Sequence, residues 1–150
     1  MVGILVTSTT EVETAKGVRV VRLRMPARPE YVALARLALA GLAGARALPD
    51  DDLADLKLAL TEAVSNSVRH AYGSGGGHVD VSYELRGRRI TIEVVDDGEG
   101  FDPDETPGFD GDELSEGGLG IAIIRTLADE LEIESRPGVR GSRLRFVKNL

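Results

Sequence analysis

The sequence predicts an α+β fold, a two-layer α/β sandwich in which a mostly antiparallel sheet carries three main helices on one face. Three observations predict it. One strand pattern is followed by two helical patterns, and the later strands come in pairs joined by short turns. A long loop and a third helical pattern separate the two pairs. Strands joined by tight turns pair antiparallel, and the helices between them can all cover one face of the sheet.

Composition narrows the class of protein. The 150 residues are enough for one domain with its own core. There is no cysteine, which excludes disulfides and thiolate metal sites and fits a reducing compartment. No apolar run approaches a membrane span and no signal-peptide pattern is present, so we expect a cytoplasmic protein outside the membrane. The net charge of −7 argues against direct nucleic-acid binding, which needs a cationic surface.

The N-terminal part divides into a leader, a strand and a helix. Residues 1–16 show no sustained periodicity, so we expect a loose leader before a single domain at 17–150. Apolar residues alternate with arginines from Val18 to Met25, which predicts a strand with one face in water. Two prolines end it, and an Ala/Leu-rich helix is expected from Glu30 to about Ala43.

The second helix is the strongest pattern in the chain. Pro49 followed by three aspartates predicts its start, because carboxylates are stabilised at the positive end of a helix dipole. It should run to about Tyr72, with an apolar stripe at spacings of three and four. A second row, Glu62, Asn66 and His70, recurs every four residues on another side. Such a row is either a solvated face or a line of functional side chains, and the pattern alone leaves both open.

The C-terminal half alternates strands, a loop and a helix. Alternating residues predict a hairpin that bends at Gly87, and Pro137 and Gly138 mark the turn between the last two strands. The expected elements are strands at 79–85 and 90–95, an acidic loop at 96–118, a helix at 119–129, and strands at 131–135 and 142–147.

An acidic, glycine-rich motif directly follows the strand at 90–95. In Asp96-Asp97-Gly98-Glu99-Gly100, glycines at alternate positions let the backbone pass close to a ligand. The Asp96 carboxylate can accept a hydrogen bond from an exocyclic amine such as that of adenine. An ordinary acidic turn or a calcium loop is the alternative, although the spacing of calcium ligands is poorly matched.

A second glycine motif leads into the third helix. The run Glu116-Gly117-Gly118-Leu119-Gly120-Ile121 places glycines at a helix N-terminus, where exposed N–H groups and the helix dipole favour phosphate. The motif lacks the Gly-Lys-Ser/Thr ending of a P-loop, and no βαβ unit surrounds it as in a dinucleotide-binding fold.

Together, the order and spacing of these features resemble the Bergerat (GHKL) ATP-binding fold. The resemblance runs from about Val18 to Val147, and the segment from Asp52 to Tyr72 is similar almost throughout to the first ATP box of the bacterial anti-sigma-factor serine/threonine protein kinases. It implies ATP and Mg²⁺ as ligands. It also implies that Asn66 coordinates the Mg²⁺ ion and that Glu62 is the general base.

The resemblance assigns the other site residues to two ends of the nucleotide. Asp96 matches the aspartate that reads adenine, with Gly98 and Gly100 shaping the base pocket. Ser142, after Gly141, stands where the family has a threonine and keeps a hydroxyl near the base. The phosphate end matches Gly118, Leu119 and Gly120, and the loop from 102 to 116 matches the ATP lid.

The implied function is regulatory phosphorylation. Kinases of this kind phosphorylate a STAS-like anti-anti-sigma partner, also sequester a sigma factor, and are commonly homodimers. The lid is acidic and contains no Lys or Arg, whereas kinases place cations near the transferred phosphate. Arg69 or Arg125 could supply that charge, although the sequence does not place either side chain. Three alternatives stay open: an ATP-binding interaction module without phosphoryl transfer, a detached histidine-kinase catalytic domain, and a domain that binds no nucleotide.

Overall fold

The computed structural model describes residues 17–72, 77–100 and 118–150. The leader expected at 1–16 and the loop matched to the ATP lid therefore lie outside the described residues. Along the described chain the elements are β1 (Val18–Pro26), η1 (Pro29–Tyr31), α1 (Val32–Arg46), α2 (Asp50–Tyr72), β2 (His78–Arg86), β3 (Arg89–Glu99), α3 (Gly118–Leu127), β4 (Glu130–Glu134) and β5 (Arg140–Asn149).

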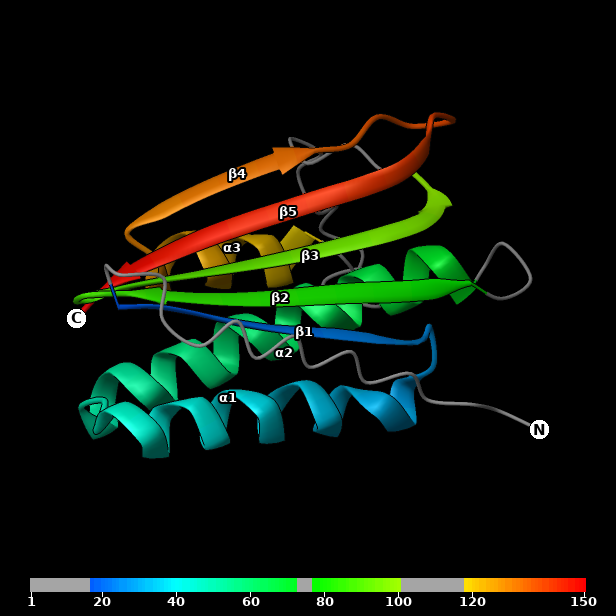
Figure 1. The fold of residues 1–150 in the computed structure, drawn as a ribbon. Helices are drawn as coiled ribbons and strands as arrows, with labels where there is room; N and C mark the ends of the chain where they lie inside the picture. The colour runs from blue at the N-terminus through cyan, green and yellow to red at the C-terminus, as the bar shows by residue number, and fades with distance from the viewer. Residues whose placement is uncertain (1–16, 73–76, 101–117) are drawn as a thin grey trace.

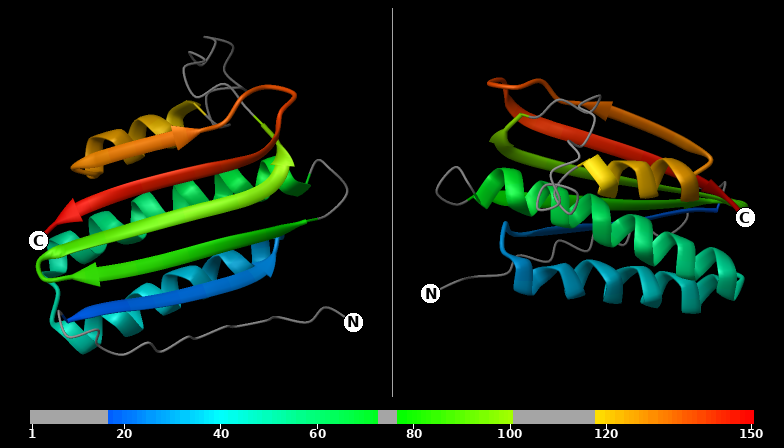
Figure 2. Two further views of the ribbon diagram at one scale, coloured as in Figure 1. Left: turned by 45° about the horizontal axis from the view of Figure 1, so that its top comes forward. Right: turned by 180° about the vertical axis from the view of Figure 1, so that it is seen from behind.

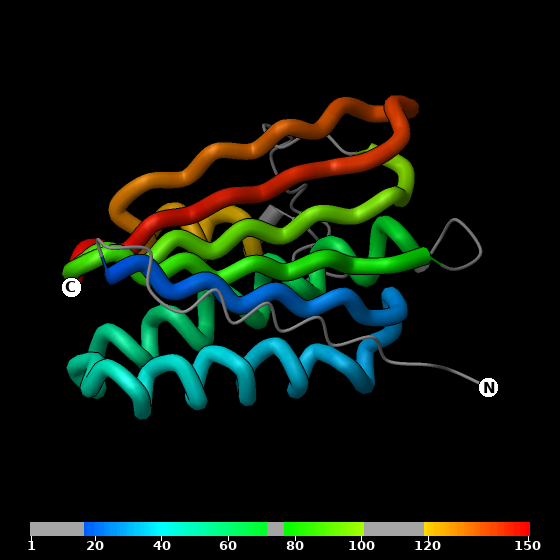
Figure 3. Tube along the Cα trace, in the orientation of Figure 1, coloured from blue at the N-terminus to red at the C-terminus, as the bar shows by residue number. Residues whose placement is uncertain are grey.

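The strands form one antiparallel sheet with the helices on one side. Its order is β1-β2-β3-β5-β4, and every neighbouring pair is antiparallel. Figures 1 and 2 show all three helices on the same face, with α2 between α1 and α3. The Cα trace in Figure 3 shows the five strands side by side in the order of their pairing. The predicted fold class is confirmed.

Element boundaries differ from the sequence expectation at the first helix. Glu30 lies in a short 3-10 turn, and α1 itself begins at Val32. The helix also extends to Arg46, three residues beyond the predicted end, because Ala47 adopts a left-handed conformation (φ 49°) and its N–H bonds the carbonyl of Ala43. A left-handed residue after the last turn is a common way to end a helix, and glycine usually occupies it.

The core lies between the sheet and the helices, and α2 covers the middle of the sheet. On β3, Ile90, Ile92 and Val94 are fully buried on the helix-facing side, and the next inward position is Asp96. The predicted apolar stripe of α2 packs against this face, with Leu56, Leu60, Val64, Ser67 and Ala71 all buried. Because this face alternates without interruption to the end of β3, the polar Asp96 is carried into the same layer as α2.

The other face of the sheet is charged. Arg143 on β5 pairs with Glu93 at 2.8 Å and Glu134 at 3.3 Å, one carboxylate from each neighbouring strand. Arg145 pairs with Glu132 on β4 at 3.7 Å. These ion pairs remain partly exposed to water, so each contributes little stability. Within the described ranges, no helix is long and apolar enough to cross a membrane.

Replacing Tyr83 with phenylalanine should lower the free energy of unfolding by about 1 kcal/mol at neutral pH. Tyr83 is fully buried, and its hydroxyl donates a 2.6 Å hydrogen bond to the carbonyl of Ala35, tying β2 to α1. Burial also raises the pKa of the Tyr83 hydroxyl. Because the unfolded chain ionises first, near pH 10, the wild type should lose stability above that pH faster than the variant.

Urea unfolding at neutral pH and above pH 10 measures both effects. The other two tyrosines are present in both proteins, so the difference isolates Tyr83. A gap between the two proteins that stays constant as the pH rises would contradict the prediction.

Candidate functional site

The row of polar side chains on α2 faces the interior of the molecule. Glu62, Asn66 and His70 lie one turn apart, each about 6 Å further along the helix axis. Asn66 is only 2% exposed, and Glu62 and His70 are partly buried, because α2 packs against both β3 and α3. The solvated-face alternative is therefore wrong for this row.

The side chain of Asn66 has an oxygen that finds no hydrogen-bond partner in the described part of the chain. Its Oδ1 atom is buried and accepts no hydrogen bond within the part of the chain that the structure describes. An unsatisfied buried acceptor costs free energy, so such an atom calls for an explanation such as a bound ion or ligand. An amide oxygen is a ligand that Mg²⁺ accepts, and Mg²⁺ completes its shell with phosphate and water oxygens. Asn66 therefore suits the role of Mg²⁺ ligand that the sequence resemblance implies.

His70 is attached to the helical turn that carries Asn66. Its Nδ1 atom lies 2.6 Å from the backbone carbonyl oxygen of Asn66, and since a carbonyl only accepts, Nδ1 carries the proton. Arg69, the next residue back, is exposed. The sequence left the roles of both residues open.

The carboxylate of Asp96 is buried and held in place by two donors. Its Oδ1 accepts from the backbone N–H of Gly98 at 3.0 Å, and its Oδ2 accepts from the Ser142 hydroxyl at 2.5 Å. Asp96 is 4% and Ser142 8% exposed, and they face each other across β3 and β5. Both line a pocket with Ile133, Ser135, Arg136, Val139 and Gly141 among its other walls. Each oxygen of the Asp96 carboxylate has a further lone pair, so the carboxylate can still accept a hydrogen bond from a ligand amine.

Two glycines after Asp96 allow close backbone packing. A Cβ on Gly98 would lie 2.6 Å from the backbone of Ala71 and from the carbonyl oxygen of His70 at the end of α2. A Cβ on Gly100 would overlap the carbonyl of Arg136, and the Gly100 N–H donates to Val139 at 3.0 Å. The sequence interpretation attributed these glycines to close approach of a ligand, and it did not anticipate these protein neighbours.

The second glycine motif, at the start of α3, contacts the other end of the polar row on α2. Gly118 begins α3, Leu119 is 48% exposed, and Gly120 is buried against α2. A Cβ on Gly120 would lie 2.8 Å from Oε2 of Glu62. Gly98 thus meets α2 at His70 and Gly120 meets it at Glu62, with Asn66 midway between them. The three motifs, far apart in sequence, meet along two turns of one helix.

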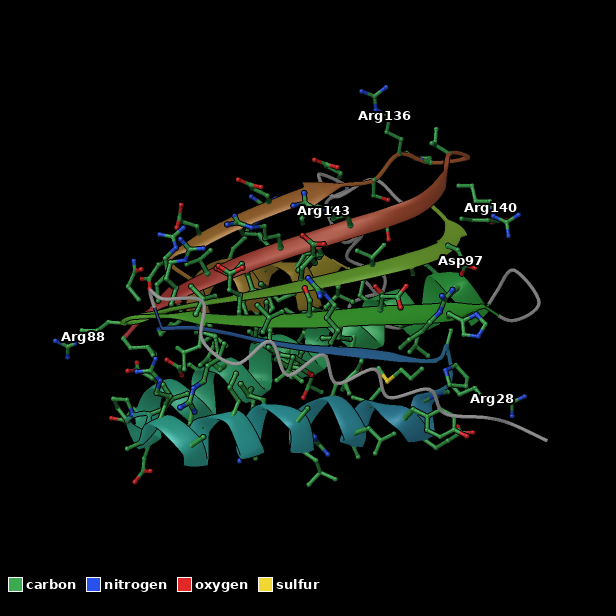
Figure 4. All side chains as sticks on the ribbon, in the orientation of Figure 1. Arg28, Arg88, Asp97, Arg136, Arg140 and Arg143 are labelled. Atoms are coloured by element: carbon green, nitrogen blue, oxygen red, sulfur yellow. The ribbon has the colours of Figure 1, made fainter. Side chains whose placement is uncertain are left out.

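The turn between β4 and β5 adds positive charge beside the Asp96 pocket. Figure 4 shows Arg136 and Arg140 projecting at the end of the molecule where Asp97 lies, with Arg88 at the opposite end. Arg136 also lines the pocket. Sequence reasoning did not include Arg136 in the site. The only signal was two arginines flanking Pro137 and Gly138, a pattern equally typical of an exposed turn.

Replacing Ser142 with alanine should weaken ATP binding about fivefold, because Asp96 loses the donor that orients its carboxylate. Threonine at 142 keeps the hydroxyl and should restore most of the affinity. Calorimetric titration with ATP measures both. Ser82→Ala is the matched control, since Ser82 lies on β2 at an outward position between buried Val81 and Tyr83. Equal affinities for the two alanine variants would contradict the prediction.

Comparison with known proteins identifies the class to which this arrangement belongs. The family described as histidine kinase-like ATPase domain matches residues 25–148, which includes α2, both glycine motifs and Ser142. Among the solved structures that share the fold are the following two. The SiaB–SiaC complex from Pseudomonas aeruginosa matches with a TM-score of 0.64 at 16% identity, over 85% of this chain and 89% of that chain. The RsbU and RsbW domains of Rv1364c from Mycobacterium tuberculosis match at 0.58 and 21%, over 86% and 32%.

Curated relatives are considerably closer in sequence. The chain is 38% identical over 136 residues to the serine-protein kinase RsbW of Bacillus velezensis and 35% identical to that of Bacillus subtilis, in each case over 85% of both chains. Identity to the serine-protein kinase RsbW of Staphylococcus aureus is 37% over 138 residues, or 85% of this chain and 87% of the relative. The chain belongs to the histidine kinase-like ATPase domain family, in the serine-protein kinase branch that these relatives represent.

Proposed function

We propose that the chain is a regulatory protein kinase that transfers the γ-phosphoryl group of Mg-ATP to a serine or threonine hydroxyl of a protein partner. The observation that carries this proposal is the buried Oδ1 of Asn66, which has no hydrogen-bond partner among the described residues and lies one helical turn from Glu62. A metal ligand and a proton acceptor on one face of one helix are what phosphoryl transfer requires of the protein.

Each residue has a separate task in this proposal. Asn66 holds Mg²⁺, which neutralises charge on the phosphates. Asp96, oriented by Ser142 and the N–H of Gly98, accepts a hydrogen bond from the adenine amine. Gly118 and Leu119 present backbone N–H groups to the phosphates at the start of α3.

Glu62 acts on the incoming hydroxyl. As the hydroxyl oxygen bonds to the γ-phosphorus, the bond from that phosphorus to the β-phosphate oxygen breaks, ADP leaves, and Glu62 accepts the hydroxyl proton. The carboxylate is partly buried beside Gly120, so a substrate hydroxyl has to enter between α2 and the start of α3.

The relatives are named serine-protein kinases, which supports a serine-bearing protein as the substrate. We propose an anti-anti-sigma protein with a STAS-like domain as the substrate. A sigma factor as a second, sequestered partner and a homodimer as the assembly belong to the same proposal.

Incubation with γ-labelled ATP and candidate STAS-domain proteins tests it. Label should appear on the partner and resist acid, as a phosphoester does, and the isosteric variant Glu62→Gln should slow labelling by about 100-fold. Acid-labile label on a histidine would indicate a histidine-kinase domain instead. Partner binding without any labelling would indicate an interaction module.

A further inference from the structure

Gly120 is a glycine in a place where the backbone does not require one. It lies in α3 without a positive φ, and in a helix alanine is the better residue. What distinguishes the position is its surroundings. The three nearest atoms to an added Cβ, outside the helix's own backbone, all belong to Glu62: Oε2 at 2.8 Å, and Cβ and Cδ at 3.8 Å. The space left by the missing side chain is the space in which the Glu62 carboxylate rests.

We propose that Gly120 is a positioning residue for Glu62: by leaving this space empty, it sets where the carboxylate stands relative to the attacking hydroxyl. The inference rests on the proposed function, in which Glu62 is the base. It also separates the tasks of the two glycines in Gly118-Leu119-Gly120. Gly118 opens the helix toward the phosphates, and Gly120 makes room for the base.

The contact also indicates how the site responds when the space is filled. Oε2 is the far end of a flexible side chain, so an added methyl group pushes the carboxylate into another rotamer and leaves the backbone in place. Gly98 differs, because its close neighbours are backbone atoms of α2, which cannot rotate away. A methyl group at 120 therefore displaces the base without unfolding the protein.

The variant Gly120→Ala tests this with three measurements. The melting temperature of the nucleotide-free protein should stay the same or rise by about 3 °C, because alanine favours the helix. The Kd for Mg-ATP should change by less than about threefold, while phosphoryl transfer to the partner slows by about 100-fold. A crystal structure of the nucleotide-free variant should show the Glu62 carboxylate rotated away from α3.

The matched control is Gly41→Ala. Gly41 is an exposed helical glycine in α1 with nothing within 4 Å of an added Cβ. It should show the same rise in melting temperature and full transfer activity, which separates loss of the base from a general effect of alanine in a helix.

Shortening the side chain of residue 62 tests whether the effects of residues 62 and 120 are coupled. In Glu62→Asp the carboxylate is drawn back by one methylene and no longer fills the space beside residue 120. Adding Gly120→Ala to Glu62→Asp should therefore slow transfer no further, although the same change is severe in the wild type.

Several results would overturn the inference. Additive losses in the double variant would do so, as would full activity in Gly120→Ala, a tenfold or greater loss of Mg-ATP affinity, or a Glu62 carboxylate that has not moved. Failure of the proposed function is recognised separately: if Glu62→Gln transfers phosphate at the wild-type rate, Glu62 is not the base, whereas the crystal structure of Gly120→Ala still decides the spatial claim.

Discussion

Replacing Asn66 with alanine is expected to abolish Mg-ATP-dependent phosphoryl transfer while leaving the nucleotide-free protein as stable as the wild type. The side chain is buried to 98%, yet its Oδ1 makes no hydrogen bond among the described residues. Its removal therefore deletes no satisfied interaction of that atom, and alanine is the better helix former. The free energy of unfolding should change by less than about 1 kcal/mol.

The loss appears only when the metal is present. Without the amide oxygen, Mg-ATP affinity should fall at least 30-fold, roughly 2 kcal/mol, and transfer should fall further because the phosphates lose their alignment. Titration calorimetry with and without Mg²⁺ measures the loss of affinity, and urea unfolding of the nucleotide-free protein measures its stability. Asn149→Ala, on an exposed residue at the end of β5, is the matched control. A variant that binds Mg-ATP normally, or that unfolds easily without it, would show that Asn66 is a structural residue.

The parts of the fold that follow from local pattern could be predicted from the sequence. Alternation along β2 and β3, the bend at Gly87 and the aspartates in the first turn of α2 each act over a few residues, and all three are confirmed. The end of α1 could not be predicted, because it depends on Ala47 taking a left-handed conformation that alanine rarely adopts. Burial of the row on α2 also depends on the tertiary packing of β3 and α3.

The site shows the same division. Asp96, Asn66 and Gly120 could be chosen from sequence because motif types and spacing mark them. The atoms that these residues contact could not be predicted, because the partners are distant in the chain. Asp96 contacts Ser142, and Gly120 lies against Glu62. The polar row on α2 was ambiguous for the same physical reason. Helical periodicity specifies which side chains share a face, and only the rest of the fold decides whether that face is covered.

Gly98→Ala is the substitution expected to cost most stability at the site. A methyl group there would lie 2.6 Å from three backbone atoms at the C-terminal end of α2, and neither β3 nor α2 can relieve this by a rotamer change. Overpacking against rigid backbone should lower the free energy of unfolding by about 1–3 kcal/mol. The direction of this stability change is informative. The same substitution at Gly44 in α1, where nothing lies within 4 Å of an added Cβ, should leave the free energy of unfolding unchanged or raise it.

The effect on ligand binding follows from the hydrogen bond between Gly98 and Asp96. The Gly98 N–H donates to Oδ1 of Asp96 at 3.0 Å, so moving residue 98 away from α2 also turns the carboxylate that should read adenine. ATP affinity should therefore fall at temperatures where the variant is still fully folded, by about tenfold if one charge-assisted hydrogen bond is lost. Denaturant unfolding and nucleotide titration of Gly98→Ala and Gly44→Ala, side by side, separate the two effects. If Gly98→Ala were less stable but bound ATP normally, the turn would hold the sheet to α2 without orienting Asp96, and the adenine end of the site would have to be assigned to other residues.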